Sequence, residues 1–117
     1  QKIKKNTPNI IWTRVESWAS FGFPDLVGYT EKGGFFTVEL KVIKSKKITF
    51  SPHQIAFHIK HPTNTWILLA TLDARTSKLS EYYLEPGSSV RQLAARGLCA
   101  CGPTRPLDQL ERLLLEA

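Results

Sequence analysis

The sequence predicts an α/β or α+β fold, built as a mixed β-sheet flanked by helices. Three runs rich in β-branched and aromatic residues come first, before any clear helical pattern. One helical pattern then precedes a strongly apolar run and a further strand, and two helical patterns end the chain. The order strand–strand–strand–helix–strand–strand–helix–helix favours a sheet with both antiparallel and parallel neighbours.

The first strand is expected at residues 10–17, although a short helix also fits that stretch. Residues 1–8 are basic and are expected to form an irregular entry to it. Residues 18–24 are expected to turn, because they include Gly22 and Pro24.

The next two runs, residues 25–30 and 34–43, are joined by Glu-Lys-Gly-Gly. A Gly-Gly pair between two apolar runs indicates a β-hairpin. A basic loop, residues 44–47, follows, and then a helix is expected over residues 51–61. Ser51 is its expected N-cap, with Pro52 at the first helical position. This helix has an apolar face with Ile55 and Ile59 and a polar face with Gln54, His58 and His61.

The second half of the chain is expected to contain two strands followed by two helices. Residues 65–73 are apolar throughout, as in the interior of a sheet, and residues 79–85 form a further strand. A helix over residues 88–98 should be capped by Ser88 or Ser89 and end at Gly97, and residues 102–106 break the chain. The last helix, residues 107–117, has a leucine stripe that packs on the sheet or forms a dimer seam.

Length and composition limit the range of functions. The 117 residues are expected to form one domain, with 42% hydrophobic and 22% charged residues. The net charge of +6 favours a polyanionic partner, most often nucleic acid. There is no apolar run long enough to cross a bilayer and no signal peptide, so an intracellular, cytoplasmic protein is expected. Cys99 and Cys101 are too close in sequence for an unstrained disulfide and are expected to be reduced thiols.

Charged residues occur where a buried strand should be apolar. Glu39 and Lys41 share one face of the strand at 34–43, because alternate side chains point in opposite directions. Asp25 opens the neighbouring strand of the hairpin and can approach Glu39. Two close carboxylates repel each other unless a cation joins them, and their hard oxygens suit Mg²⁺ or Mn²⁺. Such a metal could activate water for attack on phosphorus, with Lys41 beside it.

Two further residues could belong to that site. Glu16 could be an additional metal ligand, and Gln54 could hydrogen-bond the attacking water or a carboxylate. The alternative from composition and spacing alone is a salt-bridged, solvent-facing side of an antiparallel sheet, in which these charges have no catalytic role.

The order of these pieces resembles the PD-(D/E)xK nuclease superfamily. The pieces are Gly-Phe-Pro-Asp at residues 22–25, Val-Glu-Leu-Lys at 38–41, a helix that opens with Ser-Pro-His-Gln, and Arg-Val-Glu at 14–16. The resemblance is to the phage-type Holliday junction resolvase-like nucleases and VRR-NUC domains, and it covers roughly residues 10–73. It implies a restriction-endonuclease-like core with the active site at one edge of the sheet.

The resemblance also implies roles for individual residues. Asp25 and Glu39 would be the metal ligands, together with the main-chain carbonyl of Leu40, and Lys41 would be the catalytic lysine. Glu16 matches an additional acidic position of the family and would be a further ligand, and Gln54 matches the glutamine of its following helix. The family core begins with a full helix that often contains the extra glutamate, whereas only nine residues precede Ile10 here.

Other polar residues have both a functional and a structural interpretation. The basic loop contains Lys44, Lys46 and Lys47, which either contact DNA phosphates beside the scissile bond or are simply solvated. Arg14 has the same two interpretations. The three histidines are expected at the surface or as helix caps, although His58, one turn after Gln54, could face the cleft as a metal ligand or general base. The three tryptophans are expected in the core or at its rim, with base stacking as the alternative.

The function predicted first is metal-dependent hydrolysis of DNA phosphodiesters by an endonuclease using Mg²⁺ or Mn²⁺. By resemblance, the substrate is branched DNA such as a Holliday junction, the products have a 5′-phosphate and a 3′-hydroxyl, and the enzyme is a homodimer in a bacterium or phage-infected cell. Two alternatives stay open: a non-catalytic nucleic-acid-binding module with a nuclease-like fold, and a protein-interaction domain with a salt-bridged sheet face.

Overall fold

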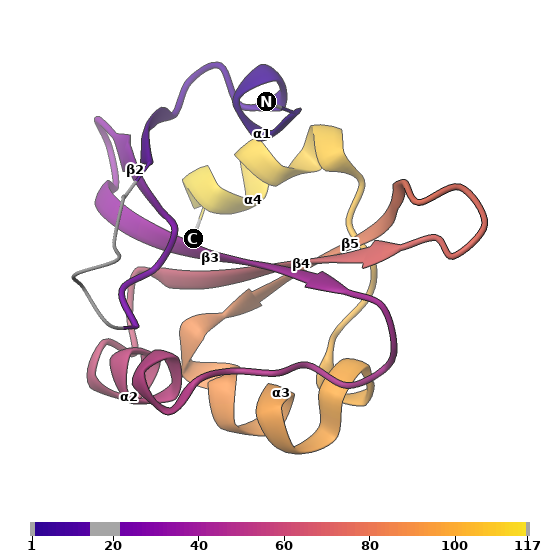
Figure 1. Ribbon diagram of the computed structural model, residues 1–117. Coiled ribbons are helices and arrows are strands. Elements are labelled where there is room, and N and C mark those ends of the chain that lie inside the picture. Colours follow the sequence, from indigo (N-terminus) through magenta and orange to yellow (C-terminus); the bar gives the residue numbers. More distant parts are fainter. Residues whose placement is uncertain (1, 15–21, 117) are drawn as a thin grey trace.

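A five-stranded mixed sheet separates two layers of helices in the computed structural model, which describes residues 2–14 and 22–116 (Figure 1). The strands lie in the order of the sequence: β1 (Ile11–Arg14), β2 (Leu26–Thr30), β3 (Gly34–Ile43), β4 (Thr65–Leu72) and β5 (Leu79–Pro86). β3 and β4 are parallel, and all other neighbours are antiparallel. The predicted α+β class with a mixed sheet is therefore confirmed.

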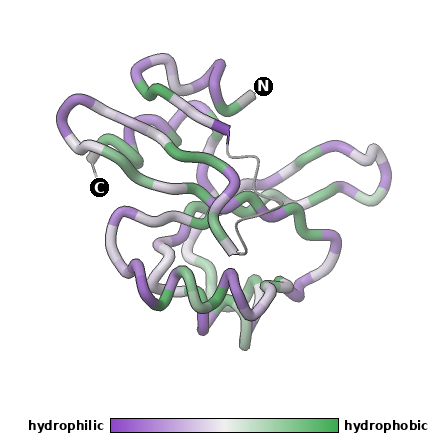
Figure 2. Tube along the Cα trace, turned by 60° about the vertical axis from the view of Figure 1, so that its left-hand side comes forward, coloured by the Kyte–Doolittle hydropathy of each residue, from purple (hydrophilic) through white to green (hydrophobic). Residues whose placement is uncertain are grey.

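The helices cover both faces of this sheet. α1 (Lys2–Asn6) and α4 (Leu110–Glu116) lie above it in Figure 1, whereas α2 (Pro52–Lys60) and α3 (Val90–Arg96) lie below it. Short 3₁₀ turns accompany these helices at Gly87–Ser89, Gly97–Ala100 and Leu107–Gln109. Hydrophobic and hydrophilic residues alternate along the trace, as expected where each element has one buried and one exposed side (Figure 2).

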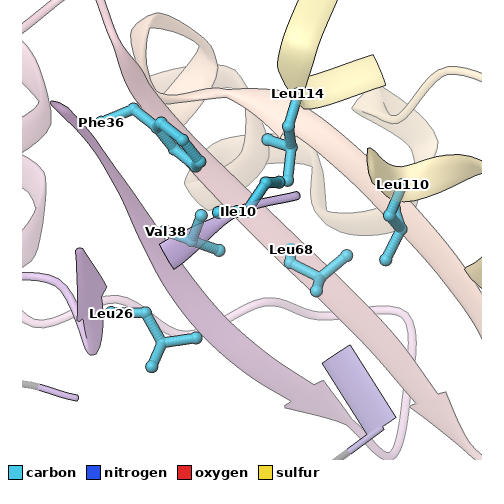
Figure 3. Packing of buried hydrophobic residues seen from close by; sticks show 7 residues of the cluster. All are labelled: Ile10, Leu26, Phe36, Val38, Leu68, Leu110 and Leu114. Carbon is cyan, nitrogen blue, oxygen red and sulfur yellow. The ribbon is translucent and has the colours of Figure 1, made fainter. Parts of the chain in front are cut away.

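The upper face holds one apolar core. Leu110 and Leu114 of α4 lie over side chains from the strands, including Val38 of β3 and Leu68 of β4 (Figure 3). Leu110 has 1% of its surface exposed. The leucine stripe of the last helix therefore packs on the sheet, the first of the two predicted possibilities.

The lower face holds a second apolar core. Residues from the end of β3, from β4 and from α3 meet there; its members are Ile43, Ile48, Phe50, Ile67, Leu69, Val90 and Leu93. The two ends of the segment between β3 and α2 are anchored in this core by Ile43 on one side and by Ile48 and Phe50 on the other.

The chain ends and α3 differ from the sequence prediction. Residues 2–6 form α1 instead of an irregular entry, and β1 ends at Arg14 within the described residues. α3 is shorter than expected because a 3₁₀ turn forms its first part, and its N-cap Ser89 makes no side-chain cap hydrogen bond. Of the described helices, none is long and apolar enough to span a membrane.

Candidate active site on the lower face of the sheet

The alternation of β3 places its charged residues on the face that α2 and α3 cover. Val38 points to the upper core, whereas Thr37, Glu39 and Lys41 point to the lower side. Glu39 has 2% of its surface exposed, although a carboxylate is strongly favoured in water. A charged group in such a place needs partners, and the nearest come from α2 and from the segment before β2.

Asp25 lies just beyond the end of the ladder between β2 and β3. The last matched residues of that ladder are Leu26 and Val38, so no residue of β2 lies opposite Leu40. The main-chain N–H of Leu40 instead donates to Oδ2 of Asp25 at 2.8 Å. The carboxylate thus completes the hydrogen bonding of β3 at the residue that follows Glu39.

The Gly-Phe-Pro segment before Asp25 packs tightly against α2. Gly22 has a φ of +80°, and a Cβ added to it would lie 2.3 Å from the main-chain oxygen of His53. Only glycine permits this close approach. Phe23 makes an edge-to-face contact with Phe57 of α2, with ring centroids 5.3 Å apart. The motif therefore fixes Asp25 relative to both β3 and α2.

Gln54 connects the start of α2 to the charged residues of β3. It forms a capping box with Ser51, which is the N-cap of α2 as predicted. Its Nε2 donates to Oε2 of Glu39 at 3.2 Å, and its Oε1 accepts from Nζ of Lys41 at 2.8 Å. One side-chain amide therefore bridges the acidic and the basic residue.

Lys41 has a second contact that the sequence did not indicate. Its Nζ lies 4.9 Å from the ring centroid of Phe50, within the range of a cation–π interaction. Phe50 immediately precedes the N-cap of α2, so the same chain segment that supplies Gln54 also supports the ammonium group. A buried aromatic residue just before a helix gives no signal for such a role in the sequence.

The protonation of Glu39 is unusual. Burial, and after it the nearby Asp25 carboxyl, raise the pKa of its carboxyl group to about 8, while Lys41 opposes this effect. Its Oε1 has no hydrogen-bond partner among the described residues. A buried carboxyl oxygen without a partner next to a second carboxylate is an arrangement that a cation would stabilise.

The residues at this site match part of the ligand set of a divalent metal. Asp25 and Glu39 supply hard oxygens of the type that Mg²⁺ or Mn²⁺ prefers, and the partnerless Oε1 of Glu39 is available. Within residues 2–14 and 22–116, however, no group of three or more His, Cys, Asp or Glu side chains could hold a metal. The two carboxylates therefore fit such an ion only with further oxygens from the Leu40 carbonyl, water or substrate phosphate.

The other predicted site residues lie at different places. Glu16 is outside the described residues, as is Trp18, so the structure does not place the additional acidic position. Arg14 is exposed at the end of β1. The lysines of the basic loop, Lys44, Lys46 and Lys47, are all exposed and follow β3 directly.

The prediction of a surface or capping position was wrong for His58. This residue is fully buried on α2, and neither ring nitrogen has a partner among the described residues. Burial lowers the pKa of His58, and His61 and Lys41 lower it further. The helix turns this residue, not Ile59, toward the sheet: Ile59 is 43% exposed. His61 is the C-cap of α2 and is exposed, as predicted.

The cysteines are not part of the site. Cys99 and Cys101 are free thiols, as expected. Burial raises the pKa of the Cys101 thiol to about 11, with a smaller contribution from Glu85. That thiol therefore stays protonated at neutral pH.

Comparisons with known proteins find similarity among solved structures alone. No protein-family model matches the sequence, and no curated protein is similar to it. A solved structure of a Holliday junction resolvase from the archaeon Archaeoglobus fulgidus is similar in backbone, with a TM-score of 0.49 and 16% sequence identity. The similarity covers 73% of this chain and 67% of the resolvase chain. At these values it assigns neither a family nor a function to the protein.

Proposed function

We propose that this protein is a metal-dependent endonuclease of the PD-(D/E)xK superfamily with a restriction-endonuclease-like core. The observation that supports this proposal best is the bridge made by Gln54 between Glu39 and Lys41, next to the contact of Asp25 with the Leu40 amide. Four residues from three separate segments thus meet at one edge of the β2–β3 ladder. A salt-bridged solvent face would not bury Glu39 to this degree.

Each residue has a distinct role in the proposed reaction. Asp25, Glu39 and the carbonyl of Leu40 would hold Mg²⁺ or Mn²⁺, which supplies Lewis-acid activation of water and charge neutralisation at phosphorus. Lys41 would bind a non-bridging oxygen of the scissile phosphate and stabilise the charge that develops there. Gln54 keeps the Lys41 ammonium oriented, and the ring of Phe50 also contacts it. Glu16 is kept as a proposed additional ligand.

The substrate and the state of assembly belong to the same proposal. The motif resemblance favours branched DNA, such as a Holliday junction, and in-line attack by water would leave a 5′-phosphate and a 3′-hydroxyl. We propose a homodimer, because two opposed strands of a junction must be cut, acting in the cytoplasm of a bacterium or phage-infected cell. Its two free thiols are compatible with that reducing compartment.

The test is cleavage of a panel of labelled DNAs. Duplex, nicked, single-stranded, flap and four-way junction forms are incubated with Mg²⁺, with Mn²⁺ and with chelator. We expect cleavage with either metal, none with chelator, and the highest rate on a branched form. Light scattering of the same preparation, with and without junction DNA, measures the molar mass and so shows whether the protein is a dimer.

Variants connect the activity to the site. Asp25→Asn and Glu39→Gln should lower the cleavage rate by roughly 10²-fold or more, because each removes a charge that holds the metal. Binding of DNA in chelator should be retained. Asp108→Asn and Glu31→Gln change exposed acidic residues elsewhere and should cleave like the wild type. Wild-type cleavage by both site variants would refute the proposed active site.

A non-catalytic nucleic-acid-binding module is the alternative. It would bind the same DNAs with no dependence on divalent metal and would cleave none of them. The third possibility, a protein-interaction domain, would bind DNA no better than heparin of the same charge.

A further inference from the structure

Two clefts meet at Lys47, and the first of them begins at Lys41 of the candidate active site. The first, of about 370 Å³, is lined by residues 41–44 and 47–49, and it contains three lysines: Lys41, Lys44 and Lys47. The second, of about 290 Å³, lies between the basic loop and the end of α3 and is lined by Lys46, Lys47, residues 94–95, Arg96 and Gly97.

Lys47 lines both clefts, so they adjoin at this residue. The described residues that line the two clefts include five cationic side chains and no acidic one; the cations are Lys41, Lys44, Lys46, Lys47 and Arg96. We call this surface the cationic track. A uniform positive sign over such a length attracts a polyanion and not a single small anion.

The far part of the track is held in place by the main chain. The N–H of Leu98 donates to the carbonyl of Lys46 at 2.8 Å. Gly97, at the C-cap of α3, has a φ of +63°, and a Cβ added there would lie 2.1 Å from that same carbonyl oxygen. Glycine therefore allows the end of α3 to contact the loop directly.

The ends of the loop are also anchored. Ile43 before it and Ile48 after it are 4% and 3% exposed and lie in the lower core. The loop that contains the three exposed lysines is thus fixed at both ends and in its middle. Its ammonium groups start from a defined main chain, which reduces the entropy lost when they bind a ligand.

We propose that the cationic track binds the phosphate backbone of DNA and that Arg96 is a phosphate-binding residue at its far end. The guanidinium group suits this role, because it can bind a phosphate through two N–H groups. Lys44 follows Lys41 by three positions, a span of about 10 Å if the chain is extended, which is close to three base-pair steps along the axis of a duplex. The strand would therefore pass from the cleavage site over the loop to the end of α3.

This inference rests on the proposed nuclease function for the direction of the track, but its test does not require cleavage. Binding of a fluorescent four-way junction is measured by anisotropy in chelator between 50 and 200 mM salt, for the wild type and for Arg96→Ala. Arg112→Ala is the matched control, because Arg112 is an exposed arginine on α4, across the sheet from α3 (Figure 1).

Arg96→Ala should bind more weakly, with a salt slope reduced by about one. The affinity ratio between wild type and variant should therefore shrink about threefold from 50 to 200 mM salt, which follows from a loss of about 0.9 in the slope. Arg112→Ala should match the wild type. Equal affinities and slopes for Arg96→Ala and the wild type, or an equal loss in Arg112→Ala, would overturn the inference.

A second variant tests the position of the loop without removing a charge. Gly97→Ala should also lower the affinity, because its Cβ must displace Lys46, while circular dichroism reports whether the fold is kept. If neither DNA cleavage nor metal dependence is found but Arg96→Ala still loses affinity, the track stands and the nuclease proposal fails. If metal-dependent cleavage is found and Arg96→Ala binds normally, the nuclease proposal stands and the cationic track fails.

Discussion

The two faces of the sheet are built from the same strands but treat polar groups differently. On the upper face, the buried Thr7 and Thr30 both have hydrogen-bond partners: Oγ1 of Thr7 donates to Ile3 and accepts from Trp12, and Oγ1 of Thr30 accepts from Gly33. On the lower face, four buried side-chain atoms of the described residues lack partners; they belong to Thr37, Glu39 and His58.

The difference indicates that the upper face stabilises the fold, whereas the lower face retains polar groups that lower stability. A buried polar atom without a partner costs about 1–3 kcal/mol, and more where the group is charged. β3 could place leucine or valine at the positions of Glu39 and Lys41, as it does on its other face. The lower face therefore keeps a destabilising arrangement, which is typical of functional sites.

Truncating the upper core should have the largest effect on stability. Leu110→Ala should lower the free energy of unfolding by about 2–5 kcal/mol, because it opens a cavity at a residue that is 1% exposed. Urea denaturation measures the change. Leu115→Ala, on the same helix but 38% exposed, should cost much less. Equal losses would mean that α4 is not a core helix, and the contrast between the faces would disappear.

Removing the ammonium group on the lower face should instead affect catalysis. Lys41→Met should lower the cleavage rate by about 10²–10³-fold, equivalent to roughly 3–4 kcal/mol of transition-state stabilisation. Its stability, measured in chelator, should change far less than that of Leu110→Ala. Lys32→Met, in the exposed turn between β2 and β3, is the control. A large loss of stability without a loss of rate would reverse the comparison.

Glu39 should make the protein less stable as the pH rises. Because its pKa is raised to about 8 in the folded state, the folded protein holds a proton that the unfolded chain releases above about 4.5. Stability should therefore fall between pH 4.5 and 8, by an amount of the order of a few kcal/mol. In chelator, Glu39→Gln should be more stable than the wild type at pH 8.5 and equal to it near pH 4.5.

Thermal unfolding at the two pH values measures this effect. Glu31→Gln, at an exposed position, should follow the wild type at both. If Glu39→Gln has no advantage at high pH, the carboxyl group does not pay a burial cost and the lower face is not destabilised by it.

His58 should produce the smallest effect, in the opposite direction on the pH scale. Its pKa is lowered below 6.5 by burial, so the unfolded chain takes up a proton more readily than the folded protein. Stability should fall as the pH drops below about 6.5, by about 1 kcal/mol over the first unit. His58→Leu should remove this dependence in urea titrations at pH 7 and 5.5, whereas exposed His53→Gln should retain it.

The strands of the fold were readable from the sequence because their patterns are local. The Gly-Gly pair gave the hairpin of β2 and β3, and the long apolar run gave β4. The Ser-Pro start gave α2 to within one residue. The first helix was missed because residues 2–6 are mostly basic and lack an acidic first turn. Its stabilisation includes long-range packing of Ile3 on the upper core, which the local pattern does not show.

The sequence indicated which charged residues approach each other, but not the packing that holds them in place. The spacing of Asp25, Glu39 and Lys41 suggested that they approach each other, and the structure brings them together with Gln54. The orientation of α2, by contrast, depends on the packing of Phe23 on Phe57 and of Gly22 on His53. A helical wheel places His58 on the same face as Gln54, but only this long-range packing determines that the face points to the sheet.

Gln54 couples Lys41 to the N-terminus of α2. Its Oε1 accepts hydrogen bonds from both the Ser51 N–H, at 3.0 Å, and the Lys41 ammonium group, so the first turn of α2 and the lysine are coupled through one atom. A displacement of the Lys41 ammonium group therefore acts on the same oxygen that accepts from the N-cap of the helix. The rate at which the Ser51 amide proton exchanges with solvent should therefore change when a ligand binds Lys41.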